Sequence, residues 1–124
     1  MTDAKMRILI VEDDEIIRGF LADSLEMKGY EPAYVADGAA ALEYLETHTV
    51  DVVLSDVRMP EMGGIALTQK LRERYPLLPV VLITGVHREE RERILAESGA
   101  AACLPKPLRI QHLCDVLDQA TARH

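Results

Sequence analysis

The sequence has no long hydrophobic run and no segment that directs a chain to a membrane. No stretch approaches the roughly 18 consecutive apolar residues that a membrane-spanning helix needs. Residues 1–5 lack the charged and then apolar pattern, with a small-residue cleavage site, that marks a signal segment. We therefore expect a cytoplasmic protein that does not associate with a membrane.

Cysteine and net positive charge are also scarce. Cys103 and Cys114 lack the spacing of a metal-binding or redox motif, and the four histidines are scattered, so we expect reduced, buried or half-buried thiols. The net charge is −7, from 14 basic and 21 acidic residues. Nucleic-acid surfaces need clustered lysine and arginine, so this balance argues against direct binding of nucleic acid. The arginines between positions 88 and 93 alternate with glutamates, which is typical of a solvated helix face.

What is present is the composition of an ordinary globular protein. The chain has 124 residues, of which 48% are hydrophobic and 28% charged. No internal repeat, low-complexity tract or linker divides it. We predict a single domain over residues 1–124.

Apolar runs and amphipathic segments alternate five times along the chain. The apolar runs predict strands over residues 6–11, 31–36, 50–55, 79–83 and 101–104, and the amphipathic segments predict helices over 14–28, 38–47, 64–75, 87–97 and 108–120. Helical spacing places five residues on the inward face of the first helix, namely Ile16, Ile17, Phe20, Leu21 and Leu25. Alternating strands and helices predict an α/β fold, a doubly wound sandwich of a parallel sheet with helices on both faces.

Chemically unusual residues follow four of the five predicted strands. Glu12 and Asp13 follow the first strand, Asp56 the third, Thr84 the fourth, and Lys106 the fifth. The carboxyl ends of parallel strands meet at one edge of a sheet, so these side chains are expected to lie together. Carboxylates suit a hard cation such as Mg²⁺, and a carboxylate can also be a nucleophile toward phosphorus. A hydroxyl and an ammonium group would contact phosphoryl oxygens, so the pattern predicts phosphoryl transfer to a carboxylate.

The residues at these strand ends form four motifs that together resemble the receiver domain of two-component response regulators. The motifs are VEDDE at 11–15, DVRMPEMGG at 56–64, ITG at 83–85 and LPKP at 104–107. Each is weak alone, but their order makes the set specific, and the resemblance covers essentially the whole chain. It implies a flavodoxin-like fold with five helices and a five-stranded parallel sheet in the order 2-1-3-4-5.

The resemblance also implies a function. A receiver domain is a signalling switch that accepts a phosphoryl group from the phosphohistidine of a sensor histidine kinase or phosphotransfer protein. It changes conformation to control a downstream protein or a fused output domain, and phosphorylation can be linked to dimer formation. Its usual output face would here include parts of 88–95 and 108–117. Because the domain assists its own phosphorylation and dephosphorylation, we predict a switch and not a metabolic enzyme.

Carried over position by position, the resemblance implies a Mg²⁺ site made of oxygen ligands. The acidic pair falls on Glu12 and Asp13, because Arg18 then keeps its usual offset from the pair. Asp13 and Asp56 would bind Mg²⁺ directly, together with the backbone carbonyl of Arg58. Glu12 would act through water. Asp14 and Glu15 are then expected to favour the start of the first helix.

The same comparison implies the groups that handle the phosphoryl group. Asp56 looks like the phosphoacceptor, Thr84 would hydrogen-bond a phosphoryl oxygen, and Lys106 would form an ion pair with it. The bond between Lys106 and Pro107 resembles one that is cis in the family. Sequence reasoning leaves two interpretations of the Arg58 side chain open, a solvated guanidinium or one that swings over the acids or the phosphoryl group.

One departure concerns how a signal would leave the site. Three residues before the lysine, the family usually carries tyrosine or phenylalanine, whose ring turns inward on phosphorylation, whereas this chain has Cys103. We therefore predict that phosphorylation reshapes residues 84–97 with little movement at Cys103.

Three rival functions are weighed against the switch. A Mg²⁺-dependent phosphatase or phosphomutase usually has a second acid two residues after its nucleophile, where this chain has Arg58. A flavin- or nucleotide-binding relative would need a glycine-rich loop after the first strand. An inert module of the same shape would not need the acid, hydroxyl and ammonium set. The sequence leaves open whether the chain acts alone or is part of a longer regulator or hybrid kinase.

Overall fold

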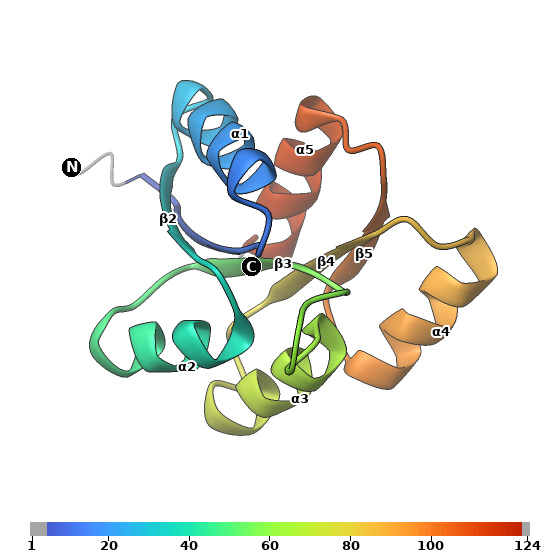
Figure 1. The fold of residues 1–124 in the computed structure, drawn as a ribbon. Coiled ribbons are helices and arrows are strands. Elements are labelled where there is room, and N and C mark those ends of the chain that lie inside the picture. The colour runs from blue at the N-terminus through green and yellow to red at the C-terminus, as the bar shows by residue number, and fades with distance from the viewer. Residues whose placement is uncertain (1–4, 123–124) are drawn as a thin grey trace.

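The structure is a computed structural model that describes residues 5–122. The strands are β1 (Arg7–Val11), β2 (Glu31–Val35), β3 (Val52–Asp56), β4 (Val80–Thr84) and β5 (Ala102–Pro105). The helices are α1 (Glu15–Met27), α2 (Gly38–Thr47), α3 (Gly64–Arg74), α4 (Arg88–Ser98) and α5 (Ile110–Ala120). All strand pairs are parallel, in the order β2-β1-β3-β4-β5 (Figure 1). The predicted fold class and strand order are confirmed.

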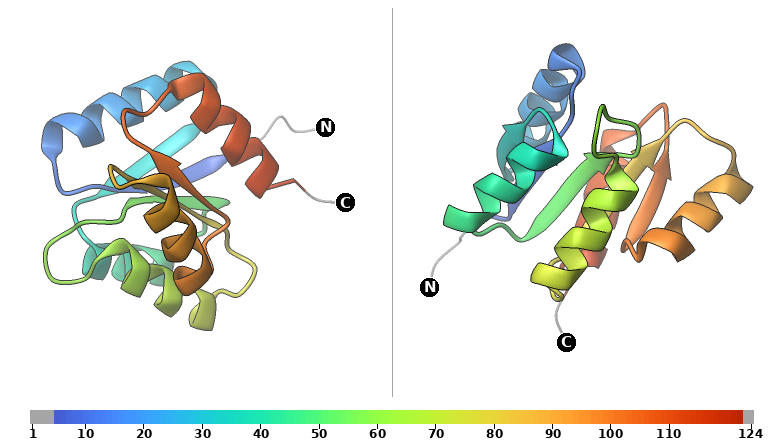
Figure 2. Two further views of the ribbon diagram at one scale, coloured as in Figure 1. Left: turned by 90° about the vertical axis from the view of Figure 1, so that its right-hand side faces the viewer. Right: turned by 60° about the horizontal axis from the view of Figure 1, so that its bottom comes forward.

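Helices cover both faces of the sheet (Figures 1 and 2). Alternate residues of the strands pack on one face against α1 and α5, around the buried side chains of Leu25 and Leu117. The other residues of the same strands pack against α2, α3 and α4, around Leu45, Leu71 and Ile94. The two central strands β3 and β4 are buried along their whole length, because both of their faces are covered.

The observed ends of β3 and β4 lie one residue beyond the predicted ends. β3 ends at Asp56 and β4 at Thr84, so both residues are the last of their strands, not the first of a loop. Asp56 pairs in register with Ile83, and Thr84 with Pro105. Both side chains are therefore held by the hydrogen-bonded sheet.

The predicted inward face of α1 is wrong for three of its five residues. Leu21 and Leu25 are buried, but Ile16 is 83% exposed and Phe20 58% exposed, and Ile17 is also exposed. At about 100° per residue, Ile16 lies about 180° and Phe20 about 140° around the helix from Leu25, so the five residues do not share one face. The covered stripe consists of Leu21, Ala22 and Leu25, and the apolar residues of the first turns remain at the surface.

Local signals fix the ends of two helices. Asp14 is the N-cap of α1, because its carboxylate accepts hydrogen bonds from the amides of Ile16 and Ile17. This agrees with the expectation that Asp14 favours the helix start. α4 ends at Gly99, whose φ of 76° is in the left-handed region that favours glycine.

The chain enters and leaves the described fold at neighbouring points. The hydroxyl of Thr121, just after α5, lies 3.9 Å from the sulfur of Met6, just before β1. Within residues 5–122, no helix is long and apolar enough to cross a membrane. Residues 1–4, on which the expected lack of a signal segment mostly rests, lie outside the described part of the chain.

Candidate metal and phosphoacceptor site

Three acids from two neighbouring strands meet at the carboxyl edge of the sheet. β1 pairs with β3, with Val11 opposite Ser55, so Glu12 and Asp13 come next to Asp56. One carboxylate oxygen from each acid lies within 4.8 Å of the others. Such an all-oxygen set fits a hard divalent cation that prefers oxygen ligands, such as Mg²⁺. The structure thus brings together the three acids that the sequence predicts at this edge.

Glu12 is held in place at several points. Its side chain is almost fully buried, its amide donates to the carbonyl of Val35 (3.1 Å), and its Oε2 accepts from the amide of Asp14 (3.1 Å). Burial raises the pKa of the Glu12 carboxyl, and the nearby charge of Asp56 raises it further, while the Asp14 amide and Lys106 lower it. A buried carboxylate in this position is poorly compensated without a cation.

Asp56 is buried and paired with the predicted lysine. The Nζ of Lys106 lies 3.0 Å from the Oδ2 of Asp56. The amide of Lys106 donates to the carbonyl of Thr84 (2.9 Å), which ties the base of the lysine to the end of β4. The Lys106–Pro107 bond is cis, as the resemblance implied.

Thr84 is buried at the end of β4, next to the β3 end that carries Asp56. Its Oγ1 accepts from the amide of Val86 (3.4 Å). The carbonyl of Val86 in turn accepts from the guanidinium of Arg91 on α4 (3.0 Å). A chain of contacts therefore runs from Thr84 into α4, through the segment that the sequence predicts will move.

The structure places the backbone amide of Arg58 beside Asp56. Its amide approaches Oδ1 of Asp56 at 3.4 Å, and its side chain is exposed. The amide contact holds the loop after β3 against the side chain of Asp56. The roles of its carbonyl toward a metal and of its guanidinium toward the site stay predictions.

The start of α3 packs directly against the strand end that carries Asp56. A Cβ on Gly64 would overlap the carbonyl oxygen of Asp56 and lie 3.0 Å from the Cα of Val57. Only glycine permits this approach of two backbones. Glu61, in the preceding turn, has a φ of 65°, which is uncommon for a residue with a side chain. Gly64 thus allows the start of α3 to pack closely against the end of β3 at Asp56.

Both cysteines are free thiols, Cys103 half-buried in β5 and Cys114 buried in α5. Burial raises the pKa of the Cys103 thiol, partly offset by the positive charge of Arg91. The raised pKa disfavours the reactive thiolate form of Cys103.

Sequence reasoning missed one contact at the acidic edge. The guanidinium of Arg18 reaches back from α1 and donates to the main-chain carbonyl of Glu12 (3.0 Å). It also lies over the ring of Tyr34 on β2, 5.8 Å from the ring centroid. The spacing of Arg18 from the acids was the only signal in the sequence, and it did not reveal the contact.

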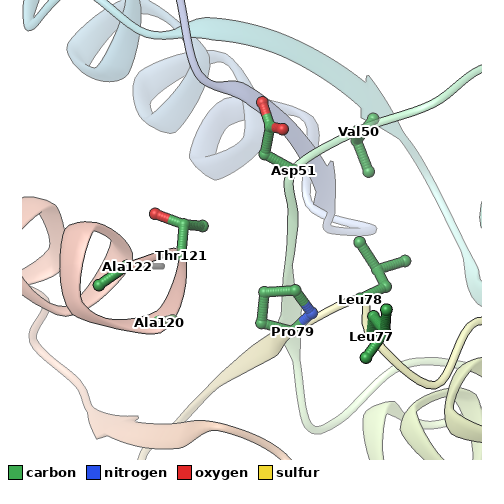
Figure 3. Close-up of a pocket in the computed structure, with 8 residues that line it drawn as sticks. All are labelled: Val50, Asp51, Leu77, Leu78, Pro79, Ala120, Thr121 and Ala122. Atoms are coloured by element: carbon green, nitrogen blue, oxygen red, sulfur yellow. The ribbon is translucent and has the colours of Figure 1, made fainter. Parts of the chain in front are cut away.

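A surface pocket of about 430 Å³ lies at the other edge of the sheet (Figure 3). It is formed by residues that precede β3 and β4 and by the end of α5, namely Val50, Asp51, Leu77, Leu78, Pro79, Ala120, Thr121 and Ala122. The carboxylate of Asp51 accepts from the amide of Arg7 (2.8 Å) and so has a structural role. The pocket lacks a cluster of reactive side chains, unlike the edge that carries Asp56.

The fold and the site together define a class of protein. A flavodoxin-like sheet carries a buried acid flanked by two further acids, a hydroxyl and an ammonium group at its carboxyl edge. The family model of the response regulator receiver domain matches residues 8–118. The chain belongs to this family, the phosphorylation-activated switches of two-component systems.

Relatives and solved structures agree with the family. The sensor histidine kinase RcsC of Salmonella typhimurium is 45% identical over 118 residues, which are 94% of this chain and 12% of that protein. The DNA-binding transcriptional regulator NtrC of Escherichia coli is 36% identical over 118 residues, 94% of this chain and 25% of that protein. The chemotaxis response regulator CheY4 of Vibrio cholerae superposes with a TM-score of 0.86 at 29% identity, covering 94% of this chain and 99% of that one.

The chain spans between about an eighth and a quarter of the length of the curated relatives described here. In those relatives the matching region is one part of a kinase or of a DNA-binding regulator. The predicted absence of direct nucleic-acid contact is therefore not confirmed at the level of a whole protein, and it stays a prediction.

Proposed function

We propose that Asp56 accepts a phosphoryl group from a phosphohistidine, and that the resulting aspartyl phosphate switches the domain. A carboxylate oxygen of Asp56 forms the new bond to phosphorus while the bond between phosphorus and the donor imidazole nitrogen breaks. The electron pair of the broken bond stays on the imidazole nitrogen, and the imidazole leaves as a neutral ring because its other nitrogen is protonated. The observation that carries this proposal is the buried Asp56 carboxylate, with Lys106 at 3.0 Å and two further acids within 4.8 Å.

The neighbours of Asp56 have distinct tasks. The ammonium of Lys106 neutralises charge on the phosphoryl oxygens, and the hydroxyl of Thr84 donates a hydrogen bond to one of them. The hydroxyl can donate to a phosphoryl oxygen while it accepts from the amide of Val86, and a shift of Thr84 toward Asp56 would lengthen that 3.4 Å contact. Phosphorylation of Asp56 would thereby alter the hydrogen bond at the Val86 amide. The Val86 carbonyl would transmit the change to the guanidinium of Arg91.

Asp13, Asp56 and the carbonyl of Arg58 would hold the metal directly, and Glu12 would hold it through water. When bound, Mg²⁺ supplies positive charge that offsets both the acids and the phosphoryl oxygens. Before it binds, three carboxylates and one ammonium group leave the edge electronegative, which favours a cation over a free phosphate ester. This excess of negative charge supports a switch that binds metal before it accepts a phosphoryl group.

The proposed donor is the phosphohistidine-bearing domain of a histidine kinase or a phosphotransfer protein. The exposed apolar side chains of Ile16, Ile17 and Phe20 lie on the first turns of α1, which follow the acids directly along the chain. Apolar surface of this kind is typical of a docking site for a protein partner. A downstream protein or fused output domain, and a dimer linked to phosphorylation, complete the proposed partners. A cytoplasmic location stays a prediction.

The test is to incubate the chain with acetyl phosphate and Mg²⁺ and to follow its intact mass. We expect a phosphoryl adduct in the native chain and in the control Asp23→Asn, which alters an exposed aspartate of α1, and none in Asp56→Asn. Faster loss of the adduct from the folded chain than from the same chain in denaturant would support self-catalysed dephosphorylation. Steady hydrolysis of generic phosphate esters would instead support an enzyme, and no adduct with any donor would support an inert module.

A further inference from the structure

Glu12 and Asp13 follow β1 directly, and the peptide that joins them sets the direction of the Asp13 side chain. The sheet holds the amide side of Glu12 through Val35, and Asp14 holds its carboxylate. The Glu12 carbonyl, which belongs to the peptide linking it to Asp13, is held by the guanidinium of Arg18 at 3.0 Å. Asp13 is exposed, so this peptide is an important constraint on where its carboxylate points.

The guanidinium is itself held from a second side. It lies over the ring of Tyr34, a residue of the edge strand β2, with 5.8 Å between Cζ and the ring centroid. Arg18 is half-buried, and its planar group can stack on a ring while it donates a hydrogen bond in its own plane. A lysine ammonium cannot combine these two contacts in the same geometry.

We propose that Arg18 and Tyr34 form a clamp on the Glu12–Asp13 peptide, and that this clamp sets the affinity of the acidic edge for Mg²⁺. This inference rests on the proposed metal site. Arg18 is a positioning residue, since it acts through the main chain of Glu12. It resembles the outer hydrogen bonds that orient metal ligands in other proteins.

Charge and position predict opposite effects for Arg18. If its positive charge were what mattered, a neutral replacement would reduce repulsion of the cation, and Mg²⁺ would bind more tightly. If Arg18 positions the peptide, the same replacement frees the Glu12 carbonyl and Mg²⁺ binds more weakly. The sign of the change therefore separates the two roles.

The experiment is calorimetric titration of the 124-residue chain with Mg²⁺ alone at fixed ionic strength. We expect Arg18→Gln and Arg18→Lys each to weaken binding by about tenfold, the scale found when a metal ligand loses its outer partner. Tyr34→Phe keeps the ring and should bind as the native chain does, whereas Tyr34→Leu should weaken binding by about threefold. Arg88→Gln, on the exposed face of α4, is the control for the same loss of charge.

Thermal unfolding of each variant without Mg²⁺ separates a folding defect from the clamp. Weaker Mg²⁺ binding with an unchanged unfolding midpoint supports the clamp. Tighter binding in Arg18→Gln, or native affinity in Arg18→Lys, overturns it while leaving the metal site intact. If the native chain itself does not bind Mg²⁺, the proposed site fails and the clamp fails with it.

Discussion

The ammonium of Lys106 lies 3.0 Å from the Oδ2 of Asp56, and the two residues come from strand ends that are not neighbours in the sheet. β4 lies between β3 and β5, so the lysine side chain extends across the end of β4, where Thr84 is buried. Asp56, Thr84 and Lys106 therefore form one contiguous group. A phosphoryl group on Asp56 would meet both of the other side chains.

Replacing Lys106 tests whether this pair serves phosphoryl transfer. We expect Lys106→Gln to slow formation of the adduct from acetyl phosphate by about 100-fold, because a preorganised positive charge is lost where negative charge gathers. Intact mass measured over time at saturating Mg²⁺ gives the rate. Lys70→Gln, an exposed lysine of α3, removes the same charge elsewhere and should react at the native rate. An unchanged rate in Lys106→Gln would assign the ion pair to structure alone.

The raised pKa of Glu12 predicts how stability depends on pH without metal. Burial and Asp56 disfavour the ionised carboxyl in the folded state, so ionisation of Glu12 costs stability above its ordinary value of 4.5. This cost is fully present above the folded pKa and disappears as the pH falls from there toward 4.5. Each unit by which the pKa is raised corresponds to about 1.4 kcal/mol.

Glu12→Gln should therefore be more stable than the native chain at neutral pH in the presence of a chelator. The advantage should shrink as the pH is lowered toward 4.5. Thermal unfolding over this range, compared with Glu43→Gln on the exposed face of α2, measures the difference. If Glu12→Gln and the native chain were equally stable at neutral pH, burial of the ionised Glu12 carboxyl would not destabilise the fold.

Two glycine-to-alanine changes should have opposite effects on stability. A Cβ on Gly64 overlaps the backbone of the Asp56 strand end, so Gly64→Ala should lower the free energy of unfolding by about 1–3 kcal/mol. Gly19 lies in α1 with open space around its Cα, so Gly19→Ala should raise it by about 0.5–1 kcal/mol. Urea unfolding of both variants measures the two changes. If Gly64→Ala and Gly19→Ala changed the free energy of unfolding equally, the packing of α3 against the end of β3 would not be tight.

The contacts from Thr84 to Arg91 predict which segment responds to a phosphoryl mimic. When the Thr84 side chain shifts toward the mimic, its 3.4 Å contact with the Val86 amide is lost, so the hydrogen exchange of that amide should speed up by at least about fivefold. Cys103 has no ring to move, so its rate of alkylation should change by less than about twofold in a Cys114→Ala background. Equal exchange throughout residues 84–97, with and without the mimic, would contradict this path.

The sequence predicted the helices and strands, and the edge of the sheet at which the candidate site lies. Buried strands such as β3 are recognisable because they are continuously apolar, and parallel topology then brings Asp56, Thr84 and Lys106 to one edge. Glu12 and Asp13 were found for the same reason. The lack of a metal-finger spacing around Cys103 and Cys114 agrees with their free thiols.

The failures of the sequence prediction have two different causes. At about 3.6 residues per turn, Ile16 and Phe20 lie nearly opposite Leu25 on α1, so the predicted five-residue face combined two sides of the helix. The contact of Arg18 with the Glu12 carbonyl needs the side chain to bend back over one turn, and the ring of Tyr34 comes from another strand. Neither of these two contacts of Arg18 leaves a periodic pattern in the sequence.

The contact between Thr121 and Met6 bears on how such a domain is combined with others. Both residues lie toward the edge of the sheet remote from Asp56, beside the strand starts, so the backbone arrives and departs at almost the same place. Sequence attached at either point would extend from the edge of the sheet opposite Asp56 and leave the acidic edge uncovered. This geometry is compatible with the matching region being 12% of RcsC and 25% of NtrC.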